Sequence, residues 1–229
     1  NLFEITECLY HHFNNHPVYT DSYLNYLLDK EKHKKDKDND TIILSFNWDS
    51  NKKNFMSHWI RKIDLKCLCT VLKSFCDIMK KKYQKHVRVT PLKKNIENNE
   101  MEMIMSILGD NHLALIEDLD IDYFCSDTLK IMKKSDVILS TDTSLLHLAL
   151  QKYTAKTIAL IRYVGEWRWG VEEDGSCMFY KDINMIRYNN YKMIESQEAY
   201  LEFEKKMMDC MISICLKNRN DVGSKITFI

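Results

Sequence analysis

Short apolar runs alternate with helix-patterned segments along this chain, and this alternation constrains its fold more than any other feature. The runs expected to form strands cover residues 41–48, 86–92, 113–116, 136–141, 156–162 and 183–187. The segments expected to form helices cover residues 65–83, 98–108, 126–134, 143–152 and 195–216. Such alternation favours a mostly parallel sheet that is covered on both faces. We therefore predict an α/β, doubly wound, Rossmann-like domain, which binds ligands beyond the carboxyl ends of its strands.

The 229 residues divide into two regions near residue 40. Residues 30–40 read KEKHKKDKDND, a run of mixed charges that is typical of a solvated linker. We predict an N-terminal helical segment and charged linker over residues 1–40, and a Rossmann-like lobe over residues 41–229. The last expected helix closes that lobe. Its expected inner side carries Leu201, Met208, Met211 and Cys215.

The charge balance gives no support for binding to nucleic acid or to a membrane surface, because the formal net charge is +0 and the sequence pI is about 7.2. No apolar run approaches the roughly 18 residues that a membrane-spanning helix needs. The first residues lack the charged-then-apolar layout of a signal peptide. The chain begins with Asn1 and not with Met, which leaves room for an upstream segment.

The eight cysteines form no CxxC pair, and three of them, Cys67, Cys69 and Cys76, lie in an apolar helical pattern. Reduced, buried thiols are the favoured interpretation, and disulfides or zinc the alternative. Residues 11–16, HHFNNH, offer a metal-binding alternative to ordinary surface histidines. We predict a reducing intracellular compartment, most simply the cytoplasm, and neither a metal nor a cofactor. No GxGxxG follows any expected strand, which argues against a dinucleotide-dependent redox enzyme.

The stretch SDVILSTDTSLLHLA, residues 135–149, changes from an apolar run to a polar turn and then to an apolar helical pattern. The turn therefore lies at the carboxyl end of a strand and at the start of a helix. Backbone N–H groups at a helix start lack intrahelical partners, and the helix dipole is positive there, so a phosphate or diphosphate fits such a place. The alternative is that Asp142 or Thr143 is a simple N-cap and that His147 makes a buried hydrogen bond.

Several segments resemble glycosyltransferases of the heptosyltransferase type, including relatives linked to tetratricopeptide repeats. Asp142-Thr143, followed after three residues by His147-Leu148-Ala149, resembles the family's D-T-x-x-x-H-L-A segment. The other matches lie in the family's order: residues 44–48 (LSFNW), 61–65 (RKIDL), 87–94 (VRVTPLKK), 127–128 (DT), 163–169 (YVGEWRW) and 174–187 (DGSCMFYKDINMIR).

The resemblance implies that this chain is the C-terminal, nucleotide-sugar-binding lobe of a two-lobed GT-B fold. It also implies binding roles for ten residues: Asp142, Thr143, Ser144, Leu145, His147, Lys93, Lys94, Trp48, Arg61 and Trp167. In the family the N-terminal lobe supplies the acceptor site and the catalytic base, so transfer would require such a lobe, or a tetratricopeptide-type segment, upstream or in another chain. No catalytic residue is assigned in this chain.

Departures from the family pattern support a second hypothesis. The loop after the first expected strand reads Trp48-Asp49-Ser50-Asn51, without the family's glycine, and Asp49 would repel a diphosphate unless it points away or meets a metal. The chain is therefore either the donor-binding part of a transferase or a non-catalytic, glycosyltransferase-derived scaffold or interaction subunit.

Overall fold

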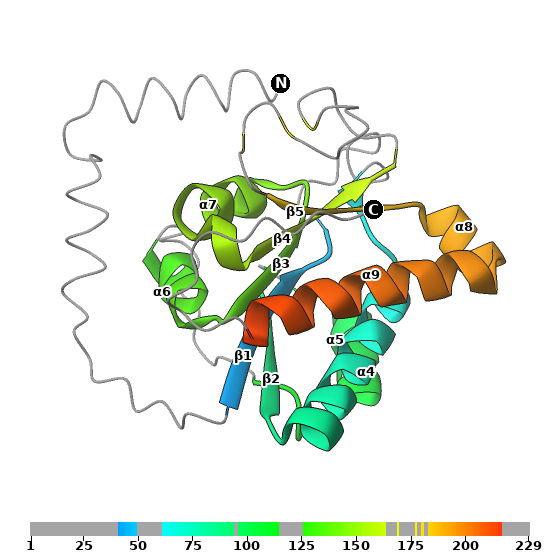
Figure 1. Cartoon of the computed structure of the whole chain (residues 1–229), viewed down its shortest axis with the longest axis horizontal. Helices are drawn as coiled ribbons and strands as arrows, with labels where there is room; N and C mark the ends of the chain where they lie inside the picture. Colours follow the sequence, from blue (N-terminus) through cyan, green and yellow to red (C-terminus); the bar gives the residue numbers. More distant parts are fainter. Residues whose placement is uncertain are drawn as a thin grey trace.

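Five parallel strands form one twisted sheet in the order β2-β1-β3-β4-β5 (Figure 1). The computed structural model describes residues 41–49, 61–93, 96–114, 126–163, 169, 177, 180 and 183–216. The strands are β1 Thr41–Asn47, β2 His86–Pro91, β3 Val137–Thr141, β4 Thr157–Arg162 and β5 Asn184–Tyr188. The helices are α4 Leu65–Tyr83, α5 Asn98–Leu108, α6 Ser126–Lys134, α7 Ser144–Tyr153, η3 Thr154–Lys156, α8 Asn190–Glu195 and α9 Gln197–Leu216.

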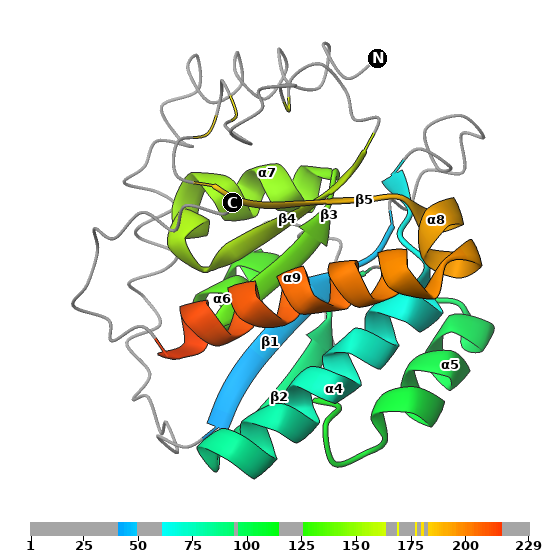
Figure 2. The same ribbon diagram turned by 45° about the vertical axis from the view of Figure 1, so that its right-hand side comes forward.

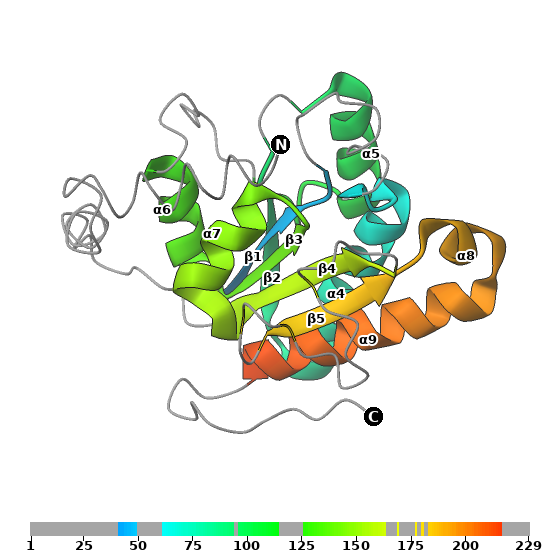
Figure 3. The same cartoon turned by 90° about the horizontal axis from the view of Figure 1, so that it is seen from above.

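Helices cover both faces of the sheet, as the sequence predicts. Figure 1 and Figure 2 show α4, α5 and α9 on one face and α6 and α7 on the other. Seen from above, α7 lies along β3 and β4 (Figure 3). The fold is thus an α/β, doubly wound, Rossmann-like domain, and this prediction is confirmed.

The strands are apolar on both sides because each face packs against helices. In β4, Ile158 and Leu160 belong to the core beneath α4 and α9, whereas Ala159 and Ile161 belong to the core beneath α7. Successive side chains of a strand point to opposite faces, so an unbroken apolar run is what a doubly covered strand requires.

The third expected strand, residues 113–116, is represented among the described residues by one parallel bridge between Leu113 and Val89 of β2. That bridge extends the sheet beyond β2. From β1 the chain thus adds β2 and then Leu113 on one side of the sheet, and it later adds β3, β4 and β5 on the other side. The direction of winding therefore changes between β1 and β3, which are neighbours in the sheet but not in the sequence. In folds of this kind, this topological switch point is where ligands bind.

The C-terminal helix differs from its prediction in two ways. The helix expected over residues 195–216 is α9, which begins two residues later, at Gln197, and a separate short helix that was not predicted, α8, precedes it and ends at Glu195. Ser196 lies between them, and its hydroxyl oxygen accepts a hydrogen bond from the N–H of Ala199, which starts α9 afresh. Leu201 is 52% exposed, so its expected place on the inner side was wrong. The buried side of α9 is made by Phe203, Met207, Met208, Cys210 and Met211.

None of the helices within the described ranges is long and apolar enough to cross a membrane. The predicted N-terminal segment and linker, residues 1–40, lie outside the described residues. The division at residue 40 therefore stays a prediction.

Candidate functional site

The floor of the candidate site is a hydrogen-bonded asparagine at the switch point. Asn47 is the last residue of β1 and is buried. Its Nδ2 donates to the backbone oxygen of Leu92, 2.8 Å away, just beyond β2. Its Oδ1 accepts from Oγ1 of Thr141, 3.3 Å away, at the end of β3. One buried amide thus ties the carboxyl ends of three neighbouring strands together.

The start of α7 lies directly beyond this floor. β3 ends at Thr141, and α7 begins at Ser144 with Thr143 in the N-cap position. The carbonyl of Thr143 accepts from the N–H groups of Leu146 and His147, at 3.0 and 3.3 Å. Its side chain makes no capping bond and lies instead 3.3 Å from the hydroxyl of Ser140. The predicted turn from strand to helix at the carboxyl edge is therefore present, but the N-cap side chain is not used for capping.

The N-cap side chains of α4 and α7 behave differently. In α4 the carboxylate of Asp64 accepts a hydrogen bond from the N–H of Cys67, the third residue of the helix, at 2.7 Å. Within the described ranges, the N–H groups of Ser144 and Leu145 make no hydrogen bond, and the side chain of Ser144 is exposed. These donors satisfy the physical requirement for an anion site at a helix start.

Charged and polar side chains form a row beside the start of α7. Nε of Arg61 lies 3.9 Å from Oδ2 of Asp142. Oδ1 of Asp142 lies 3.8 Å from Nε2 of His147, and Nδ1 of His147 lies 2.6 Å from the hydroxyl oxygen of Tyr180. Arg61 and Asp142 are both buried. The carboxylate of Asp142 therefore lies between a permanent cation and an imidazole.

An aromatic stack holds the imidazole of His147 in place. Its ring lies 5.4 Å from that of Trp169 at an interplanar angle of 15°, and Trp169 lies 5.9 Å from Tyr180 at 21°. Trp169 is fully buried and packs against Leu146 and Ile161. Trp169 is thus the buried member of the stack, whereas His147 and Tyr180 are half-buried.

A second cluster, centred on Lys93, follows β2. Nζ of Lys93 lies 2.8 Å from both carboxylate oxygens of Glu100 and 3.6 Å from Oδ2 of Asp49. Nε1 of Trp48 donates to Oε1 of Glu100 at 3.0 Å, and Nζ of Lys93 lies 4.9 Å from the centre of the Trp48 ring. The side chains of Lys93, Asp49 and Glu100 are only 8%, 2% and 10% exposed. Most of the charge of Lys93 is therefore compensated within the protein.

The Lys93 cluster makes the stability of the fold depend on pH. Burial alone raises the pKa of Glu100, but hydrogen bonds from Lys93, Trp48 and the backbone of Glu97 outweigh it and hold that pKa below its usual value. A carboxyl with a depressed folded-state pKa stabilises the fold above its unfolded pKa of about 4.3 and loses that effect as the pH falls through its folded-state value.

We expect Glu100→Gln to lower the stability at neutral pH and to flatten the loss of stability between about pH 5 and pH 3. Urea denaturation at a series of pH values measures this. Glu202→Gln is the matched control, because Glu202 also has a lowered pKa but pairs with Lys206 at an exposed site, where ion pairs contribute little. If the free energy of unfolding depends on pH in the same way for wild type and Glu100→Gln, then Glu100 is not the source of this pH dependence.

The structure brings eight of the ten predicted site residues to the carboxyl edge of the sheet. Asp142, Thr143, Ser144, His147 and Arg61 surround the start of α7. Trp48 and Lys93 belong to the neighbouring Lys93 cluster, where Trp48 is fully buried. Leu145 is half-buried and packs against the core beneath α6. Lys94 and Trp167 lie outside the described residues. Ligand binding by any of these residues stays a prediction.

Three residues at this edge were not predicted from the sequence. Glu100 is the partner of Lys93, Tyr180 is the partner of His147, and Arg162 ends β4. Burial raises the pKa of the Tyr188 phenol, and the charges of Arg162, Asp142 and Asp49 act on the same group, so all three lie near it. Arg162 could have been found from the sequence, because it is the last residue of an expected strand. The sequence held no comparable signal for Glu100 or Tyr180.

Among the described residues, no group of three or more His, Cys, Asp or Glu side chains is arranged to hold a metal ion. The described cysteines are free thiols. Burial raises the pKa of the Cys69 and Cys76 thiols to about 12. These thiols therefore stay protonated at neutral pH, which disfavours both metal ligation and nucleophilic chemistry.

Comparisons with known proteins do not assign the chain to a family. No family model matches it, and no curated protein matches its sequence significantly. Solved structures similar to it include a Listeria monocytogenes protein assigned as a UDP-N-acetylglucosamine 2-epimerase (16% identity, TM-score 0.39). They also include S. aureus MnaA with UDP (18%, TM-score 0.38) and a Neisseria meningitidis UDP-GlcNAc 2-epimerase bound to UDP-GlcNAc (14%, TM-score 0.35).

These similarities cover 86%, 82% and 88% of this chain but only 41%, 44% and 50% of the respective neighbours. The chain thus spans about half the length of the proteins it resembles. The resemblance to the heptosyltransferase type stays a prediction from the sequence, and the assignment of the fold rests on the sheet topology of the chain itself. The chain is an α/β, doubly wound domain with a strand-to-helix turn at its switch point.

Proposed function

We propose that this chain binds the diphosphate of a nucleotide sugar at the start of α7 and serves as the donor-binding lobe of a glycosyltransferase-like enzyme. The observation that carries this proposal is the uncapped start of α7 at the switch point of the sheet. Thr143 occupies the N-cap position without capping, which leaves the amides of Ser144 and Leu145 as donors beside an exposed hydroxyl. A bound phosphate oxygen would satisfy these donors and the helix dipole together.

The electrostatics favour recognition by neutral donors over recognition by lysine. Lys93 is engaged by Glu100 and Asp49, and Arg61 lies beside Asp142. The attraction for an anion therefore comes from backbone amides and hydroxyls, with Arg61 offsetting the charge of Asp142. Such dipoles hold a diphosphate without requiring that a buried ion pair be broken.

Transfer of the sugar requires a second structural unit. A single lobe can bind a donor at the carboxyl ends of its strands. It does not by itself orient an acceptor or exclude water from the reacting bond. We propose that an N-terminal lobe or a tetratricopeptide-type segment, upstream or in another chain, completes the enzyme. The resemblance of residues 142–149 to the D-T-x-x-x-H-L-A segment supports this assignment.

Isothermal titration with a panel of ligands tests the proposal. The panel contains UDP, UDP-GlcNAc, ADP, GDP, a heptose nucleotide and inorganic phosphate. We expect saturable binding of at least one nucleoside diphosphate, at one site per chain, with weaker binding of inorganic phosphate. Failure of every nucleotide to bind a folded sample, including the protein assembled with its natural partners, would refute the proposal.

A second candidate function is that of a non-catalytic scaffold derived from a glycosyltransferase. The observation in its favour is that the cations Lys93 and Arg61 both lie against carboxylates. If this is the function, the Thr143→Ala/His147→Ala double variant should keep both fold and assembly. Loss of biological activity by that variant, with fold and assembly intact, would reject the scaffold and favour ligand binding.

A further inference from the structure

We propose that Tyr180 is a positioning residue that holds neutral His147 in the tautomer with its proton on Nε2, so that the imidazole presents an N–H donor to the ligand of the α7 site. This inference deepens the proposed function and rests on it for the nature of the ligand. Its structural part, the tautomer, is testable without any ligand.

The contact at Nδ1 is the first part of the argument. The hydroxyl oxygen of Tyr180 lies 2.6 Å from Nδ1 of His147, within normal hydrogen-bond distance. A neutral imidazole has one donor nitrogen and one acceptor nitrogen, and the partner of one nitrogen decides the state of the other. If the phenol donates to Nδ1, then the imidazole proton is on Nε2.

The carboxylate of Asp142 near Nε2 favours this direction for the hydrogen bond. Oδ1 of Asp142 lies 3.8 Å from Nε2. A carboxylate at that distance repels the lone pair of a bare nitrogen and attracts an N–H group, so it favours the proton on Nε2. The separation is longer than a hydrogen bond, so Asp142 biases the tautomer without accepting this proton in a hydrogen bond.

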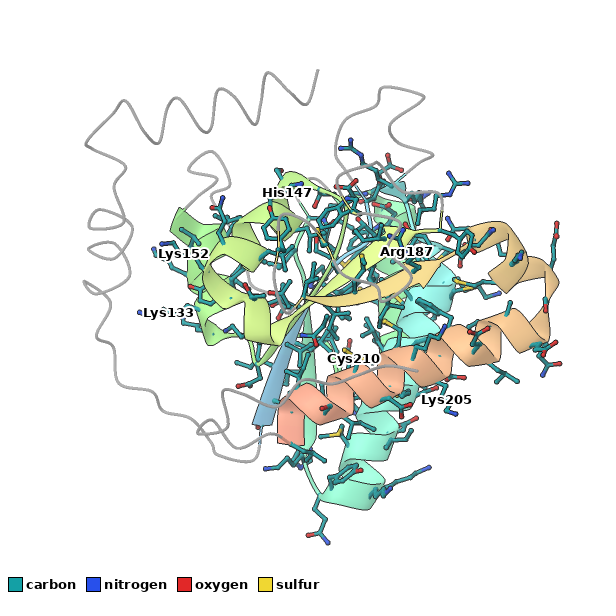
Figure 4. All side chains as sticks on the ribbon, turned by 45° about the horizontal axis from the view of Figure 1, so that its top comes forward. Lys133, His147, Lys152, Arg187, Lys205 and Cys210 are labelled. Carbon is teal, nitrogen blue, oxygen red and sulfur yellow. The ribbon has the colours of Figure 1, made fainter. Side chains whose placement is uncertain are left out.

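The aromatic stack fixes the orientation of the ring. Trp169 is buried beneath His147, with the ring centres 5.4 Å apart and the planes 15° apart. The side chain of His147 keeps 23% of its surface exposed. Figure 4 shows His147 on α7, on the opposite side of the sheet from Lys205 on α9. The ring is therefore held by Tyr180 and Trp169 while part of it stays accessible.

The chemical consequence is selectivity for a ligand that offers an acceptor. Nε2–H is a further donor on the helix whose first two amides are those of Ser144 and Leu145. A phosphate oxygen of a nucleoside diphosphate suits this set of donors. In the opposite tautomer, Nε2 would present a lone pair to the same oxygen and repel it.

The test combines a nitrogen spectrum with a binding measurement. Long-range ¹H–¹⁵N correlation spectra of the full chain are recorded at about pH 8.5, about two units above the ordinary titration of histidine. The resonances of His147 are identified by their loss in His147→Gln. We expect a protonated Nε2 and an unprotonated Nδ1 in wild type, and a shift toward a mixture of tautomers in Tyr180→Phe, which keeps the ring but removes the hydroxyl.

The binding part uses UDP as the probe and a double-variant cycle. Removal of one hydrogen bond that orients a donor is expected to weaken UDP binding by roughly 3- to 10-fold in Tyr180→Phe. In the His147→Gln background the same change should have no further effect, because an amide side chain has no tautomer. Tyr163→Phe, which removes the hydroxyl of a tyrosine that is 71% exposed, is the matched control and should leave both readouts unchanged.

Three outcomes overturn the inference. The first two are a wild-type His147 with its proton on Nδ1 and a Tyr180→Phe spectrum identical to wild type. The third is an effect of Tyr180→Phe on UDP binding that is as large in the His147→Gln background as in wild type, because such an effect would not act through His147. If the tautomer changes as expected but UDP and the other nucleotides do not bind, then the positioning role stands and the proposed function fails.

Discussion

Replacement of Lys93 with methionine is expected to lower the free energy of unfolding by about 3–5 kcal/mol, because it leaves the buried carboxylate of Glu100 without its cation. Lys93 lies within 4 Å of both Glu100 and Asp49, and the three side chains are at most 10% exposed. Methionine fills a similar volume, so the loss measures charge compensation more than packing. The indole N–H of Trp48 still donates to Glu100, but one neutral donor does not replace an ammonium group.

Chemical denaturation at neutral pH measures this effect, with Lys205→Met as the control. Lys205 is exposed on α9, and its replacement should change the stability by no more than about 0.5 kcal/mol. The Lys93→Met/Glu100→Met double variant should recover part of the loss, because it removes the stranded carboxylate of Glu100. A loss of less than about 1 kcal/mol in Lys93→Met would show that the cluster is not an essential part of the fold.

Ser144→Glu is expected to change binding and stability in opposite directions. A carboxylate at the first position of α7 interacts favourably with the helix dipole, which should raise the stability by about 0.3–1 kcal/mol. The same carboxylate would occupy the amides and repel an incoming diphosphate. At a separation of about 4 Å and an effective dielectric constant of about 20, that repulsion reaches about 4 kcal/mol, so UDP binding should weaken by at least about 100-fold.

Two control variants isolate the effect of charge in this experiment. Ser144→Gln introduces a side chain of the same size without charge and should retain most of the affinity. Gln151→Glu places a carboxylate at an exposed position of the same helix, far from its start, and should leave the affinity unchanged. If Ser144→Glu binds UDP as tightly as wild type, then the diphosphate is not at the start of α7.

The sheet was predictable from the sequence because each strand is buried on both faces. Residues 137–141 are all buried, and a continuous apolar run bounded by polar residues is how such a strand reads. The inner side of α9 was not predictable in the same way. Leu201 and Phe203 are both apolar, and only the packing of α9 against α4 and the sheet decides that Phe203 is buried and Leu201 exposed.

The turn into α7 was predictable because its residues are adjacent in the sequence. The partners of the predicted site residues were not. Lys93 was expected to meet phosphate, yet its carboxylate partner Glu100 enters from the first turn of α5. His147 and Tyr180 are 33 residues apart and meet only through the fold. Pairing of this kind is set by tertiary structure, which spacing along the chain does not encode.

The most direct test of the donor-lobe account is a titration of the ¹⁵N-labelled full chain with UDP, followed at individual backbone amides. The account predicts that the N–H resonances of Ser144 and Leu145 show the largest saturable shifts, as their protons become hydrogen-bonded to phosphate oxygens. Ser144→Glu should abolish those shifts. Saturable shifts confined to other parts of the chain, with Ser144 and Leu145 unmoved, would contradict the account.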